Sequence, residues 1–174
     1  FKDAIKDCLS TNPVDGLCTS STYGSMPGWD VSRVTDMSKA FAGREKFNGD
    51  ISEWDVSNVT DMSKMFYEAK SFNQSLNNWK VSKVKYMDYL FAESNLSTSN
   101  YDSTLIGWSE QTVQPGVRLG ADGISYCNAS AAKETLIDKG WEIWDVGQKC
   151  LITDATFKDA IKDCLSTNPV DGLC

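Results

Sequence analysis

The middle of the chain repeats itself with a period of 25 residues, and this repeat limits the fold more than any other feature. The segments 29–53 and 54–78 agree at thirteen of 25 aligned positions. A third segment, 79–103, keeps six columns, which hold Trp, Val, Ser, Val, Met and Phe. Most of these survivors are large and apolar, as expected for columns that face a core. A unit this short cannot bury such side chains alone, so successive units must stack as coils of a solenoid.

Each unit combines an extended part with a part at helical spacing. The pattern Trp-x-Val-Ser-x-Val alternates apolar and polar residues, which predicts a half-buried strand or an extended turn. Four apolar residues then follow Thr60 at helical spacing: Met62, Met65, Phe66 and Ala69. They predict a short helix with Thr60 at its N-cap and Asp61 near the positive end of its dipole.

Three columns of the repeat are predicted to form the core of the stack. They hold the tryptophans Trp29, Trp54 and Trp79, the methionines Met37, Met62 and Met87, and the phenylalanines Phe41, Phe66 and Phe91. The expected fold is therefore α/β, a short solenoid of about 25-residue coils with terminal caps.

The flanking segments have patterns of their own. Residues 1–13 predict an amphipathic helix ended by Asn12 and Pro13. "VRLGADGISYC" predicts a strand, a glycine-rich turn and a second strand, and "NASAAKETLIDKGW" predicts a helix with Gly140 at its C-terminus.

These patterns divide the chain into four parts. We expect an N-terminal helix and capping segment at 1–28 and coils at 29–108, comprising 29–53, 54–78, 79–103 and a degenerate coil. A C-terminal capping module at 109–156 follows. The last part, 157–174, is identical to 1–18.

This long duplication predicts a tandem array. Thr156 and Asp159 supply a capping-box-like start to the second copy that the first copy lacks. The simplest interpretation is that the chain comes from a longer array with a 156-residue period, in which 157–174 begins the next module. An engineered cap and a duplication without structural meaning are the alternatives. Residues expected at the module junction are Phe1, Ile5, Leu9, Phe157, Ile161 and Leu165.

The six cysteines favour disulfides and an oxidising compartment. None forms a CxxC pair, so zinc and thioredoxin-like interpretations are poor. Local pairing would close three short loops: Cys8–Cys18, Cys127–Cys150 and Cys164–Cys174. Buried free thiols in a cytosolic protein are the alternative.

Composition and motifs argue against several classes of function. A net charge of −7 disfavours nucleic acid and anionic membranes as partners, and no apolar run approaches the roughly 20 residues of a membrane span. The chain lacks histidine and any G-x-S-x-G, Walker or Rossmann motif, so we expect no enzyme and no cofactor. The aspartates of the repeat suggest turns rather than calcium, because the third coil has Lys80 and Tyr86 in their columns.

Four Asn-x-Ser/Thr sequons occur, at Asn58, Asn73, Asn95 and Asn128. Long charged residues share the columns of Asn58 and Asn95, which indicates solvated positions open to a glycan. Asn73 shares its column with Asn48 and follows Phe72, so we expect an inward asparagine ladder there and no glycan. Asn128, beside Cys127, is also a candidate, but it lies outside the aligned repeat units, so no repeat column indicates its exposure.

The unit "WDVSNVTDMSKMF…FNQSLNNW" resembles the BspA-like surface-protein repeats, also described as a domain of unknown function in mycoplasma lipoproteins. The tail "YDSTLIGW…GISYCNASAAKETLIDKGWEIWDVGQKC" is similar to the module that often ends such arrays. This resemblance covers roughly 29–150, and Lys80 and Tyr86 of the third unit depart from it. It implies a leucine-rich-repeat-like solenoid that is secreted or on a cell surface, in adhesive or structural roles, with no catalytic residues to transfer.

The function expected from the sequence is therefore structural. Extracellular modules would join head to tail with copies of themselves into a fibre or stalk, with glycans as a coat. The alternative is an adhesin whose solenoid face binds a glycan or a protein. No membrane insertion is expected for this segment.

Overall fold

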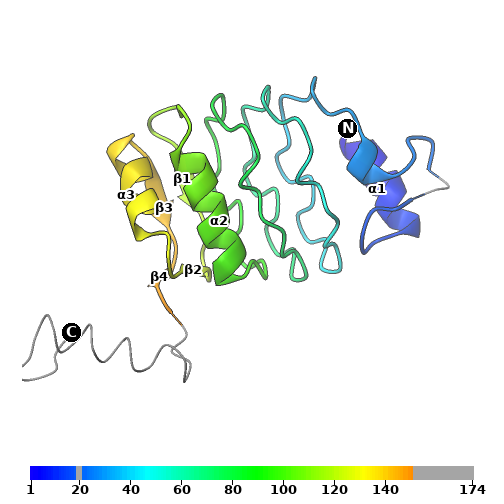
Figure 1. The fold of residues 1–174 in the computed structure, drawn as a ribbon. Helices are drawn as coiled ribbons and strands as arrows, with labels where there is room; N and C mark the ends of the chain where they lie inside the picture. Colours follow the sequence, from blue (N-terminus) through cyan, green and yellow to red (C-terminus); the bar gives the residue numbers. More distant parts are fainter. Residues whose placement is uncertain (19–20, 151–174) are drawn as a thin grey trace, which may run out of the picture.

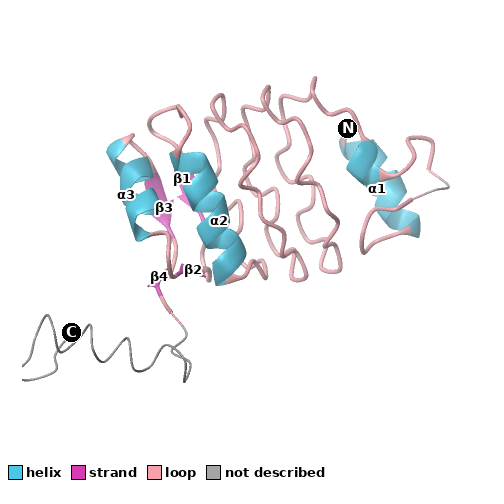
Figure 2. Cartoon of the chain, in the orientation of Figure 1, coloured by secondary structure: helices cyan, strands magenta, loops and turns pink. Residues whose placement is uncertain are grey.

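The computed structural model describes residues 1–18 and 21–150, which form a mixed α/β fold (Figures 1 and 2). These residues contain three α-helices, a short 3-10 turn and four short strands: α1 (Lys2–Thr11), η1 (Met26–Gly28), α2 (Thr98–Ser109), β1 (Arg118–Gly120), β2 (Ser125–Tyr126), α3 (Ser130–Asp138), β3 (Glu142–Trp144) and β4 (Gly147–Gln148). β1 pairs with β3 and β2 with β4, both in parallel. Within the described ranges, no helix has the length and apolar character needed to cross a bilayer.

Successive 25-residue units lie side by side in parallel, in a row between α1 and α3 (Figure 1). Asp36 pairs with Asp61, and Asp61 with Tyr86, in isolated parallel bridges. Every second amide from Met62 to Glu68 donates to a carbonyl of the next unit at 2.8–3.0 Å: Met62 to Tyr86, Lys64 to Asp88, Phe66 to Leu90 and Glu68 to Ala92. The unit that repeats in the sequence is therefore the unit that repeats in space.

The short helix predicted after Thr60 is wrong, because the segment forms consecutive turns. Lys64 and Glu68 have φ of +57° and +56°, in the left-handed region that interrupts a right-handed helix. Alternate amides are also committed to the next coil and cannot close helical hydrogen bonds. Thr60 caps no helix and donates its hydroxyl to a carbonyl of the preceding coil, while Asp61 accepts from the Ser63 amide in a turn.

The predicted core columns lie inside the stack. All their methionine and phenylalanine side chains are buried, as are Trp54 and Trp79, whereas Trp29 is half-buried at the N-terminal end. The rings of Phe41, Phe66 and Phe91 stack with centroid separations of 5.5 and 5.9 Å. Each such buried side chain contributes about 1.5–3 kcal/mol to folding.

The tryptophans also fix the register between coils. The indole nitrogen of Trp54 donates to the carbonyl of Met26 at 3.1 Å, and that of Trp79 to Ile51 at 3.0 Å. Trp108 makes the same bond one coil later. A slip of one residue would leave a buried indole N–H without an acceptor, which costs about 1–3 kcal/mol.

Both ends of the stack are closed by helices. In α1 the predicted apolar face is buried, and the helix ends where the Asn12 amide donates to the Cys8 carbonyl at 3.0 Å. The strands and the helix predicted for 117–140 are present, and Gly140 ends α3 with φ of +92°. The sequence patterns missed α2, which spans the end of the predicted third coil and the degenerate coil. Its signal is Ser97, whose side chain accepts from the Asn100 amide as an N-cap.

Candidate functional site

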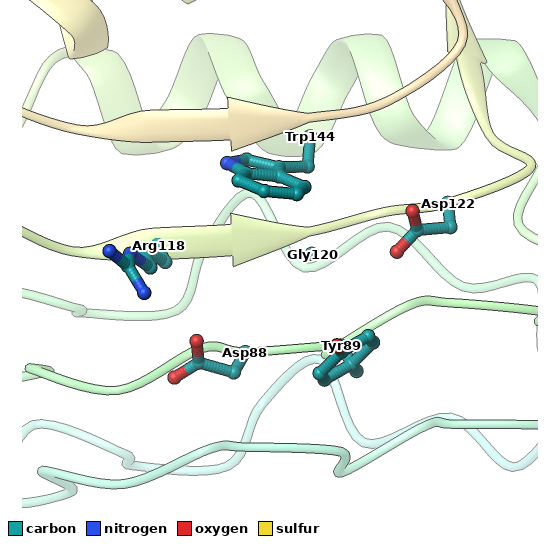
Figure 3. A pocket seen from close by; sticks show the side chains of 6 residues that line it. All are labelled: Asp88, Tyr89, Arg118, Gly120, Asp122 and Trp144. Carbon is teal, nitrogen blue, oxygen red and sulfur yellow. The ribbon is translucent and has the colours of Figure 1, made fainter.

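A shallow pocket of about 170 Å³ opens on the face of the stack where amides of one coil donate to carbonyls of the next, called the ladder face below (Figure 3). Six residues line it: Asp88, Tyr89, Arg118, Gly120, Asp122 and Trp144. They come from the third coil, from β1 with the turn after it, and from β3. The pocket therefore forms where the coils meet the C-terminal cap.

Strand geometry explains how these side chains converge. Arg118, Gly120 and Asp122 alternate with the buried Leu119 and Ala121, so the period of two residues turns them outward. Gly120 lies opposite Trp144 in the β1–β3 register. On its other side the Gly120 amide donates to the Met87 carbonyl.

Gly120 lies between the backbones that carry Tyr89 and Trp144. A Cβ at Gly120 would clash with the Tyr89 backbone nitrogen, so only glycine permits this close approach of backbones. Trp144 lies on the other side of Gly120, opposite it in the β1–β3 register. Both side chains are solvent-exposed, at 51% for Tyr89 and 61% for Trp144. Figure 3 shows the two aromatic residues on either side of the Gly120 strand.

The pocket combines hydrogen-bond donors and acceptors. The Arg118 guanidinium pairs with Glu142 at 3.1 Å, and both side chains are more than half exposed. The Asp88 carboxylate lies on the side of the pocket that the third coil forms. The Asp122 carboxylate lies at the end of the pocket where the chain leaves β1 (Figure 3). Lys64 places its ammonium 5.2 Å from the centre of the Tyr89 ring. The pocket residues themselves carry more negative than positive charge.

The neighbouring residue Asp145 holds the Trp144 wall in place. Its buried carboxylate accepts from the Tyr101 hydroxyl at 3.0 Å, from the Lys133 ammonium at 2.6 Å and from the Gly147 amide at 2.9 Å. Burial and then the Asp145 charge raise the pKa of Tyr101 well above its ordinary value, so the phenol stays a donor. The backbone that carries Trp144 is thereby tied to both α2 and α3.

Sequence patterns missed all of these pocket side chains. One signal was available, since Tyr89 stands in a column that holds Lys39 and Lys64 in the first two units. The aspartates of the repeat do what turns require: the Ser32 and Ser57 amides donate to Asp30 and Asp55 at 3.0 Å. In the part of the chain that the structure describes, no cluster of three or more His, Cys, Asp or Glu residues could hold a metal ion.

The predicted glycosylation sites differ in their surroundings. Asn95 and Asn128 are exposed. Asn58 is exposed too, but its amide nitrogen donates to the Ser32 carbonyl at 2.8 Å and its oxygen accepts from Lys83 at 2.7 Å. A glycan on Asn58 would disturb the bond to Ser32, a cost that sequence columns did not indicate.

Asn73 belongs to the asparagine ladder expected at this turn. Its backbone amide donates to the side-chain oxygen of Asn48 at 2.8 Å. Its own side-chain oxygen accepts from the Ser97 amide and from the Asn100 side chain, both at 2.8 Å. The side-chain oxygen of Asn73 is therefore engaged between coils, as expected for the ladder.

Two predicted disulfides are present, Cys8–Cys18 in the N-terminal cap and Cys127–Cys150 in the C-terminal one. Cys164 and Cys174 lie outside the described residues, as do Phe157, Ile161 and Leu165. Among the predicted junction residues, Ile5 and Leu9 are buried against the first coils, and the Phe1 ring lies 5.7 Å from that of Trp54. The apolar face of α1 is thus used inside this module.

Comparison with known proteins places this chain in a family. Residues 17–116 match the family model described as "Mycoplasma protein of unknown function, DUF285", which is 100 of the 174 residues. The chain belongs to this family. No curated protein and no solved structure matches it.

The DUF285 match covers the coils and α2 but only part of the pocket. Asp88 and Tyr89 lie within it, whereas Arg118, Asp122 and Trp144 come from the segment that follows. A property of the pocket would therefore depend on the DUF285 coils and on this chain's own C-terminal cap together.

Proposed function

We propose that this chain is part of an extracellular structural protein in which 156-residue modules join head to tail into a fibre or stalk. Each module would be a short leucine-rich-repeat-like solenoid with disulfide-pinned caps. The parallel ladder between coils and the stacked phenylalanine column support the solenoid interpretation. The two disulfides support an oxidising, extracellular or cell-surface location.

The observation that carries this proposal is that the duplicated segment is a cap. Residues 1–18 fold onto coils that follow them: Phe1 contacts Trp54, Lys2 pairs with Asp36 at 3.0 Å, and the Gly16 carbonyl accepts from the Met26 amide at 2.9 Å. The identical segment 157–174 carries the same apolar face and the same cysteines. It therefore suits a further stack of coils placed after it.

The burial of α1 changes which surface would form the junction. In a following module, Ile161 and Leu165 would fill the core positions of Ile5 and Leu9. Contacts between modules would then fall to the exposed polar face of α1 and to the six residues between Cys150 and Phe157. We propose that this short tether limits how far adjacent modules can separate.

A chain of two full periods tests the cap directly. In this chain residues 19–156 are repeated after position 174, and hydrogen exchange is compared with that of the 174-residue chain. We expect segment 157–174 to gain protection equal to that of segment 1–18, and Cys164 and Cys174 to pair. Ile161→Asp should abolish the gain, whereas Lys162→Ala, matched to the exposed Lys6, should keep it. Equal exchange in both chains would contradict the proposal.

A second candidate function is a binding module at the cell surface, an adhesin that meets a glycan or a protein through its ladder face. The observation that favours it is the pocket with two exposed rings. Exposed aromatic side chains grouped on one face are typical of interaction sites. The two functions are compatible, since a fibre can display the pocket once per module.

A further inference from the structure

We infer that the pocket between Tyr89 and Trp144 is a binding site for an uncharged saccharide, with one sugar ring held between the two aromatic side chains. The inference rests on the binding function proposed as the second candidate and names the ligand class of that site. It does not depend on whether modules join into a fibre.

The dimensions of the pocket suit one sugar ring. Tyr89 and Trp144 come from the backbone segments on either side of Gly120, and both line the pocket. The pocket volume of about 170 Å³ suits a single six-membered ring better than a peptide segment.

The chemistry of the walls suits hydroxyl groups. A sugar presents C–H groups on its ring faces, which are apolar, and hydroxyls at its edge, which both donate and accept. The aromatic walls offer apolar faces to the ring. Asp88 and Asp122 are acceptors, and the Arg118 guanidinium is a fork of donors, so the rim offers both kinds of partner.

The charges of the pocket favour a neutral ligand over a charged one. An anionic group would meet Asp88, Asp122 and the nearby Glu142 on a chain of net charge −7. A cationic side chain would find carboxylates and rings, but it would also meet Arg118 in the same pocket. A neutral polyol can hydrogen-bond to the carboxylates and to the guanidinium without bringing a charge of its own into the pocket.

Binding is measured with the full chain against a panel of neutral oligosaccharides built from glucose, mannose, galactose and N-acetylglucosamine. Tryptophan fluorescence serves as the readout, because Trp144 is 61% exposed, whereas Trp29 is half-buried and Trp54, Trp79, Trp108 and Trp141 are at most 3% exposed. Isothermal calorimetry confirms any hit. We expect at least one member of the panel to bind and to shield Trp144 from iodide quenching.

Variants then separate the pocket from the rest of the face. We expect Trp144→Ala and Tyr89→Ala each to weaken binding about tenfold or more. Tyr86→Ala is the matched control, since Tyr86 is an exposed tyrosine of the same coil that does not line the pocket. Thermal unfolding of each variant shows that the fold is intact. If Tyr89→Ala does not fold, Asp122→Asn replaces it and should also weaken binding.

Two results would overturn the inference. One is that no oligosaccharide in the panel binds, and the other is that binding survives Trp144→Ala unchanged. An oligolysine peptide, tested in parallel, distinguishes a wrong ligand class from a face that binds nothing. If it binds in a manner sensitive to Trp144→Ala while every saccharide fails, the face is a binding site and the ligand class is wrong. If neither probe binds, the proposed binding function and the proposed saccharide ligand are both wrong.

Discussion

Truncation of Phe66 should strongly destabilise the coil stack. Its side chain is fully buried and its ring stacks on Phe72, Phe41 and Phe91 with centroids 3.8, 5.5 and 5.9 Å away. Phe→Ala in a core costs about 3–5 kcal/mol because the transfer free energy is lost and a cavity remains. Because Phe66 has three ring neighbours, we expect Phe66→Ala to cost about 4–5 kcal/mol of stability, the upper end of that range.

Urea unfolding, followed by circular dichroism, measures this cost as the shift in midpoint multiplied by the slope m. The matched control is Tyr67→Ala, the next residue, whose ring is outside the phenylalanine stack, with an expected cost below about 1 kcal/mol. A domain of this size has about 5–15 kcal/mol of stability, so Phe66→Ala can approach unfolding. Phe66→Leu then serves instead, at about 1–2 kcal/mol. A loss for Phe66→Ala no larger than for Tyr67→Ala would refute the stacked-column account.

Three further predictions concern polar groups and cross-links. Asn73→Ala should cost about 1–3 kcal/mol in the same urea assay, because it leaves amide donors of the next coil without an acceptor, whereas the exposed Asn78→Ala should cost little. Replacing the Cys127–Cys150 disulfide by two serines should cost about 3 kcal/mol through the loop that it closes, and an unchanged midpoint would argue against that loop-closure reasoning. Hydrogen bonds from the hydroxyl and amide two residues later hold the pKa of Asp30 and Asp55 below the ordinary 3.8. The stability that these hydrogen bonds contribute is therefore present above about pH 4 and is lost as the pH falls through the lower folded pKa values. The double variant Asp30→Asn with Asp55→Asn should flatten that part of the curve of stability against pH.

The parts of the fold that were predicted are those set by patterns within the sequence. The 25-residue period fixes which tryptophan, methionine and phenylalanine side chains share a column, and local spacing fixes the amphipathic face of α1 and the two disulfides. The coil helix was mispredicted because spacing of three and four residues also arises from consecutive tight turns. Only the backbone shows that Lys64 and Glu68 adopt positive φ.

The pocket could not be predicted because it depends on which rungs become neighbours. Tyr89 and Trp144 are 55 positions apart in the sequence and belong to different patterns. They line one pocket because β1 inserts between the third coil and β3, with Gly120 between the backbones that carry them. Nothing in the local sequence around either residue indicates that insertion.

Electron microscopy of a chain extended to many 156-residue periods tests the central proposal most directly. The account predicts continuous filaments with a regular axial repeat, one module per step, in which the caps that correspond to α1 recur at equal spacing. Separate beads at irregular spacing along a flexible chain would contradict head-to-tail assembly and leave the modules as independent units.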